Sequence, residues 1–163
     1  MKDLGVGFGV FTESVGPVVL KDNQLINMGE SYIVTNLVQI EGADNETIIQ
    51  LKLKVFSVNK ADTPDLYSCI NRNQLMVIGR SPNCDIRIED ELLSKMQSTI
   101  YFDQNAEAWV IEDGYQGKSS TNGTWLYLNE EVKIRSGMLF KSNQTFFQAA
   151  IADGEDSSTF LDN

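Results

Sequence analysis

The chain has 163 residues, with 13 Lys and Arg against 23 Asp and Glu, so its formal net charge is −10 at pH 7. This acidic balance argues against general nucleic-acid binding, which needs a basic footprint. No apolar run approaches the ~18 residues that a membrane-spanning segment needs. The sequence contains no histidine, which excludes Ser-His-Asp and Cys-His catalysis and zinc sites with histidine ligands.

The two cysteines, Cys69 and Cys84, are too few to hold a zinc ion by themselves. The first ten residues lack the basic stretch and apolar block of a signal peptide. We therefore expect a cytoplasmic or nuclear protein with two reduced thiols, a disulfide between them being the alternative. No metal and no cofactor is expected.

Strand patterns recur along the whole chain, each bounded by Gly, Asn, Asp, Pro or Ser. The clearest lies at 49–58, where apolar residues alternate with polar ones, so that one face is buried. A strand rich in β-branched residues is expected before it at 32–40, joined to it by a polar hairpin loop at 41–46. Further strands are predicted at 6–12, 17–20, 75–79, 85–88, 98–103, 108–113, 124–128, 132–135, 138–141 and 144–150.

Many short strands, and no helical period longer than about two turns, predict an all-β fold of the sandwich type. Residues 1–47 are expected to form an N-terminal β extension packed on the core, because 32–40 is too apolar to lie exposed. The main domain is predicted over 48–150. Residues 151–163 are acidic and are predicted to form a flexible tail.

Four short motifs follow one another at regular distances. They are Gly79-Arg80 followed by Ser81-Pro-Asn-Cys-Asp-Ile86, then Ser94, then Trp109-Val-Ile-Glu-Asp113, and finally Thr121-Asn-Gly-Thr124. In this order they resemble the forkhead-associated (FHA) domain, over about residues 50–150. The resemblance implies an FHA-like β-sandwich of two antiparallel sheets, here with an N-terminal strand extension, whose loops bind phosphothreonine peptides.

The sequence departs from the family pattern at two positions. The family's histidine falls on Gln97, whose amide can donate and accept hydrogen bonds at a similar reach. Lys95 stands where arginine is frequent, which keeps a cation but loses the planar fork of donors. Gly79, Gln97 and Gly123 are expected to support the loops, and Gly123 to adopt a positive φ.

The chemistry of a phosphothreonine site can be derived from the residues themselves. The phosphate brings roughly −1.5 to −2 charges and three acceptor oxygens. Arg80 is predicted to supply a cation and a fork of donors. Ser94 would supply a hydroxyl and Lys95 a second charge. Thr121 and Asn122 would lie on a facing loop, where the Asn amide can hold the ligand backbone.

Each of these residues also has a purely structural interpretation. Arg80 could be a surface ion-pair partner, Ser94 a turn cap, and Asn122-Gly123 a tight turn. Two tryptophans, Trp109 and Trp125, are expected in the core rather than at a binding surface. Three further cations, Arg72, Arg87 and Lys118, are expected on solvated faces.

The sequence therefore predicts a non-catalytic, monomeric module that binds a phosphothreonine-containing protein downstream of a Ser/Thr kinase, without contact with nucleic acid or membrane. One alternative is an FHA-like scaffold domain that binds without phosphate, suggested by Gln97 and by the N-terminal extension. A second alternative is an enzyme that uses the paired carboxylates of Glu89-Asp90-Glu91.

Overall fold

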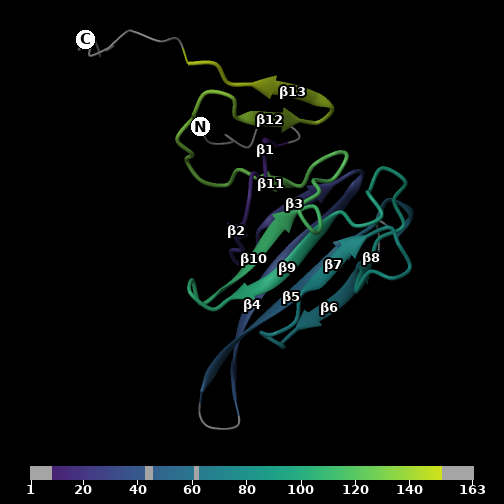
Figure 1. Cartoon of the computed structure of the whole chain (residues 1–163), viewed down its shortest axis with the longest axis vertical. Coiled ribbons are helices and arrows are strands. Elements are labelled where there is room, and N and C mark those ends of the chain that lie inside the picture. The colour runs from purple at the N-terminus through teal and green to yellow at the C-terminus, as the bar shows by residue number, and fades with distance from the viewer. Residues whose placement is uncertain (1–8, 43–45, 61–62, 152–163) are drawn as a thin grey trace, which may run out of the picture. The chain divides into compact units, whose positions relative to one another are not determined.

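The computed structural model describes residues 9–42, 46–60 and 63–151 (Figure 1). Within these ranges the chain forms strands, loops and one short 3-10 helix, η1 (Val58–Lys60). No helix in the described ranges is long and apolar enough to cross a membrane. Except for Ile151, the predicted acidic tail lies outside the described residues.

The chain divides into two compact units. The larger unit is Glu13–Tyr127, and the smaller combines Met1–Thr12 with Leu128–Asn163.

One sheet of the larger unit contains most of the N-terminal half of the chain. Its strands lie in the order β11-β3-β4-β5-β6, and every neighbouring pair is antiparallel. The strands are β3 (Leu25–Met28), β4 (Ser31–Glu41), β5 (Thr47–Phe56), β6 (Asp65–Cys69) and β11 (Trp125–Tyr127).

The second sheet of this unit has the order β2-β10-β9-β7-β8. Its strands are β2 (Val18–Val19), β7 (Met76–Gly79), β8 (Ile86–Arg87), β9 (Ser98–Asp103) and β10 (Ala108–Asp113). One pair departs from the antiparallel arrangement that the resemblance implies, because β7 and β8 run parallel, with Ile78 opposite Ile86.

The core of the larger unit is built by alternation along the strands. On β5, Leu51 and Leu53 are buried whereas Lys52 and Lys54 are exposed, as the pattern at 49–58 predicts. The buried side chains of β5 join those of the second sheet, among them Ile78, Ile100 and Ile111, in one hydrophobic cluster. The prediction of an all-β sandwich is confirmed (Figure 1).

The two tryptophans lie in the core, as expected. Trp109 is 1% exposed, donates from Nε1 to the carbonyl of Ile49 at 2.9 Å, and meets the ring of Phe102 edge-on with 5.5 Å between ring centroids. The expectation that Arg72 lies on a solvated face is wrong. Arg72 does not extend into solvent but stacks its guanidinium 4.5 Å from the Phe102 centroid and pairs with Glu46 at 3.6 Å.

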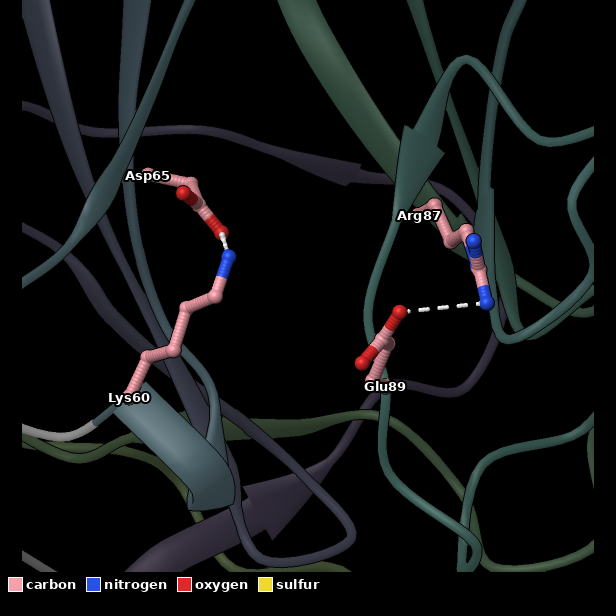
Figure 2. A network of polar contacts seen from close by, with 4 residues as sticks. All are labelled: Lys60, Asp65, Arg87 and Glu89. Atoms are coloured by element: carbon pink, nitrogen blue, oxygen red, sulfur yellow. Dashed lines mark ion pairs between the residues drawn. The ribbon is translucent and has the colours of Figure 1, made fainter.

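Two strands of the first sheet were not predicted. β3 carries buried Asn27, whose Nδ2 donates to the carbonyls of Gly29 and Ser31 in the turn that follows, so the strand shows no alternation. β6 presents Leu66 to solvent, 72% exposed, which reverses the expected pattern. Between β5 and β6, Lys60 of η1 pairs with Asp65 at 3.5 Å (Figure 2).

The N-terminal strands are hydrogen-bonded to the rest of the larger unit. β4 pairs with β5 from Tyr32 opposite Phe56 to Glu41 opposite Thr47, and β2 pairs with β10. The domain boundaries at residues 47 and 150 stay a prediction.

In the smaller unit, β12 (Leu139–Ser142) and β13 (Thr145–Gln148) form a hairpin, and β1 (Phe11–Glu13) pairs with β12 through its first two residues. The strand predicted at 132–135 is wrong. These residues form a loop in which Ile134 is 40% exposed, and a turn with Gly137 at φ +86° follows.

Candidate functional site

Three loops of the larger unit are joined by hydrogen bonds into one structure, which we call the rim. They are the β7–β8 loop at 80–85, the β8–β9 loop at 88–97 and the β10–β11 loop at 114–124. The N–H of Arg80 donates to the carbonyl of Ser94 at 3.2 Å, and that of Thr121 donates to Ser94 Oγ at 2.9 Å. Ser94 therefore connects the other two loops.

Arg80 is exposed, but the root of its guanidinium is fixed. Its Nε donates to the carbonyl of Leu93 at 2.8 Å, and the Leu93 side chain is buried in the core. Within the described ranges, neither terminal guanidinium nitrogen has a hydrogen-bond or ion-pair partner. The geometry holds the cation in place and leaves two nitrogens, with their N–H groups, for a ligand.

Two hydroxyls meet where the β8–β9 loop contacts the β10–β11 loop. Ser94 Oγ accepts from the N–H of Thr121 and donates to Thr121 Oγ1 at 3.2 Å. Because a hydroxyl hydrogen rotates freely, the donated bond can be exchanged for a bond to an anionic oxygen while the accepted bond remains.

Asn122 lies on the same loop as Thr121, and its side chain is hydrogen-bonded to the β8–β9 loop. Its Nδ2 donates to the carbonyl of Leu92 at 2.7 Å, and its backbone carbonyl accepts from Trp125 Nε1 at 2.8 Å. The next residue, Gly123, has φ +74°, as predicted. A Cβ there would lie 3.1 Å from Trp125 Nε1, so a side chain would also crowd this contact.

Gln97 is fully buried beneath the rim. Its Oε1 accepts from the N–H of Ser94 at 2.9 Å, and its Nε2 donates to Ser120 Oγ at 2.7 Å and to the carbonyl of Gly123 at 3.0 Å. One side chain thus uses both its acceptor and its donors to tie the β8–β9 loop to the β10–β11 loop. The amide at this position fits the supporting contacts that the family's histidine is expected to make.

Two supporting residues, Asp113 and Ser120, were absent from the predicted site. Asp113 Oδ1 accepts from Ser120 Oγ and from Thr124 Oγ1, each at 2.7 Å, and Oδ2 accepts from the Ser120 N–H at 2.9 Å. Burial, and to a lesser degree the charge of Asp113, raise the pKa of the neighbouring Glu13 carboxyl. In the sequence, Asp113 ends both a predicted strand and the Trp109-Val-Ile-Glu-Asp113 motif, and Ser120 precedes the Thr-Asn-Gly turn.

A glycine is needed at position 79 because the backbone of Lys95 lies too close to leave room for a side chain, and not because of its φ angle. A Cβ on Gly79 would lie 2.4 Å from the carbonyl oxygen of Lys95. That same oxygen accepts from the N–H of Ser81 at 3.1 Å and from Cys84 Sγ at 3.2 Å. The Lys95 side chain itself is exposed.

The acidic run does not form a carboxylate pair. Glu89 pairs with Arg87 at 3.1 Å (Figure 2). Asp90 is buried, and its carboxylate accepts two hydrogen bonds from Glu30 and Ser31 and one from Leu92 in its own loop. Glu91 is exposed. The carboxylates of Glu89 and Asp90 are thus occupied by structural contacts.

Both cysteines are free thiols. Cys69 is buried, and burial raises its pKa to about 11. Burial also raises the pKa of Cys84, which is partly accessible. Neither thiol has the electropositive surroundings of a reactive cysteine.

Residues 76–144 match the family model of the FHA domain. The chain carries an FHA domain. The match contains all three loops of the rim, and the strands before residue 76 lie outside it. No curated protein matches the chain. FHA domains are interaction modules that recognise phosphopeptides.

Proposed function

We propose that the rim binds a phosphothreonine within a peptide segment of a partner protein. The observation that carries the proposal is the direct connection of Arg80, Ser94 and Thr121 by hydrogen bonds between loops. A phosphate needs a cation and several N–H or O–H donors, and this cluster offers a guanidinium fork with two hydroxyls.

The remaining site residues add a charge, contacts to the peptide backbone and support for the loops. Lys95 adds an exposed ammonium group on the β8–β9 loop. Asn122 retains a second N–H and its Oδ1, with which it can hold the backbone of a peptide across the rim. Gly79, Gln97 and Gly123 support the loops through the contacts given above. On a chain of net charge −10, such a local cationic site selects an anion that the rest of the surface repels.

Hydrogen bonds to charged groups contribute about 1.5–3 kcal/mol each, so two or three of them support binding near the micromolar range after ordering costs. In this proposal the protein has no catalytic activity and acts as a monomer. It recruits a cytoplasmic or nuclear partner downstream of a Ser/Thr kinase, and it needs no cofactor, nucleic acid or membrane.

An array of peptides in phosphothreonine, phosphoserine and unmodified forms tests the proposal. The array is probed with wild type, with Arg80→Ala, and with Lys54→Ala, which removes an exposed cation from β5 instead. We expect phosphothreonine-dependent spots that Arg80→Ala loses and Lys54→Ala keeps. Binding that ignores the phosphate and survives Arg80→Ala would indicate the phosphate-independent scaffold instead.

A further inference from the structure

One loop of the rim is hydrogen-bonded to a part of the chain that lies outside the FHA match. The β3–β4 turn, Gly29 and Glu30, together with Ser31 at the start of β4, contacts Asp90 at the beginning of the β8–β9 loop. Asp90 Oδ2 accepts from the N–H of Glu30 at 2.8 Å and from Ser31 Oγ at 2.8 Å. Asp90 is 3% exposed and Ser31 is 1% exposed, so the bond between their side chains is buried, whereas the bond from the Glu30 N–H is partly buried.

The same carboxylate also organises the loop that carries Ser94. Asp90 Oδ1 accepts from the N–H of Leu92 at 2.9 Å, and the carbonyl of Asp90 accepts from the N–H of Leu93 at 3.1 Å. The N–H of Leu93 shares its peptide group with the Leu92 carbonyl, so these bonds set the direction of that carbonyl directly. The Leu93 carbonyl belongs to the next peptide group, whose N–H, that of Ser94, donates to Gln97 Oε1. The carbonyls of Leu92 and Leu93 are the groups that receive Asn122 Nδ2 and Arg80 Nε.

The β3–β4 turn is itself held by hydrogen bonds. Asn27 Nδ2 donates to the carbonyls of Gly29 and Ser31, and Asn27 lies opposite Trp125 in the β3–β11 register. A Cβ on Gly29, where φ is +58°, would lie 2.8 Å from Asp90 Oδ2. The turn therefore has the conformation and the small residue that allow its backbone to approach the carboxylate.

From these contacts we infer that Asp90 is a positioning residue for the rim, through which the β3–β4 turn sets the direction of Arg80 and Asn122. The inference rests on the proposed function only for its effect on affinity. It predicts a second consequence without ligand, because the loop that Asp90 holds also provides the hydrogen bonds of Ser94 and Thr121.

The test compares Asp90→Asn and Ser31→Ala with Asp103→Asn. Asp103 is a matched control, because its Oδ1 accepts from the N–H groups of Asn105 and Ala106 in the β9–β10 turn, outside the rim. Amide hydrogen exchange is measured without ligand, at a temperature where each variant is fully folded. The affinity for the best phosphothreonine peptide of the array is measured at the same temperature.

In Asp90→Asn we expect faster exchange at the amides of Ser94 and Thr121 and a loss of affinity of at least about tenfold. Ser31→Ala should show a smaller change in the same direction, and Asp103→Asn should match wild type at the rim. Unchanged exchange at Ser94 and Thr121 in folded Asp90→Asn would overturn the inference. So would faster exchange that leaves peptide affinity equal to wild type. If wild type binds no phosphothreonine peptide, the proposed function fails, and exchange alone decides whether Asp90 holds the loop.

Discussion

The backbone N–H of Thr121 donates a hydrogen bond to Ser94 Oγ at 2.9 Å across a separation of 27 residues in the sequence. This bond joins the β8–β9 loop to the β10–β11 loop without any ligand. A site whose donors are already held in place avoids part of the ordering cost of binding. The supporting contacts below this pair lead to specific predictions.

Gln97→Ala should lower the free energy of unfolding by roughly 2–4 kcal/mol, because it removes the partner of the Ser94 N–H and of the Gly123 carbonyl and opens a cavity. It also removes one of the hydrogen bonds of Ser120 Oγ. Gln97→Glu should lose more at neutral pH, since a buried carboxylate can only accept. Urea denaturation at pH 7 measures both. Equal stability of Gln97→Ala and wild type would contradict the contacts that we assign to Gln97.

Gly79→Ala should reduce stability by about 1–3 kcal/mol and also weaken phosphopeptide binding, because a Cβ 2.4 Å from the Lys95 carbonyl must displace the β8–β9 loop. Gly16→Ala is the control. Gly16 has φ +78°, and no atom lies within 4 Å of the place that an added methyl group would take, so its cost of roughly 1–2 kcal/mol is conformational and local. Thermal unfolding and peptide titration separate the two effects. Unchanged phosphopeptide binding in Gly79→Ala would contradict the prediction that the close contact of Gly79 with the Lys95 carbonyl positions the β8–β9 loop.

Glu13→Gln should stabilise the protein at pH 7, because the folded state raises the pKa of Glu13 and therefore disfavours its ionised form. A raised carboxyl pKa means that the folded wild type gains stability as the pH falls through that pKa. The advantage of Glu13→Gln should accordingly disappear below the ordinary Glu pKa, about 4.3. Parallel denaturation curves between pH 4 and pH 7 measure this difference. A gap of constant size across that range would contradict the prediction.

Both thiols should react slowly with a thiol reagent at pH 8 in the native protein. Burial raises the pKa of Cys69 to about 11, so very little thiolate is present, and its side chain is inaccessible. Cys84 should react first, since it is partly accessible. Cys69→Ala and Cys84→Ala assign the two phases. Immediate reaction of Cys69 in the folded protein would be inconsistent with its place in the core.

Arg80→Ala should weaken phosphothreonine peptide binding by at least about tenfold, the effect of losing one charge-assisted hydrogen bond. Arg80→Lys should recover part of the affinity, because it keeps the charge but not the fork. Isothermal titration at low and high salt gives the size of each effect. Identical affinities for wild type and Arg80→Ala would remove this guanidinium from the binding site.

The sequence allowed the sandwich and most of its strands to be predicted, because residues such as Leu51 and Leu53 alternate with exposed lysines. β3 and β6 could not be predicted in this way. Asn27 of β3 is buried for its hydrogen bonds to a turn, and Leu66 of β6 points to solvent. In β3, the contacts of Asn27 override the pattern of hydrophobic residues, and nothing in the structure explains the exposure of Leu66.

The residues proposed to meet a ligand stand in short motifs and could be named from them. Their supports could not be named so easily. Asp90 and Ser31 are 59 residues apart in the sequence, and nothing in either segment indicates the other. In the sequence Asp90 stands within an acidic run, yet its role in the structure is set by two donors, the Glu30 N–H and Ser31 Oγ, that the fold brings to it.

The most direct test of a phosphate-binding rim is a titration of wild type with one peptide sequence in its threonine, phosphoserine and phosphothreonine forms. The peptide is taken from the strongest spot of the array, and binding is followed by fluorescence anisotropy. We expect saturation near the micromolar range for phosphothreonine, weaker binding of phosphoserine, and none of the threonine form at the same concentrations. Equal affinity for the phosphothreonine and threonine forms would contradict the account.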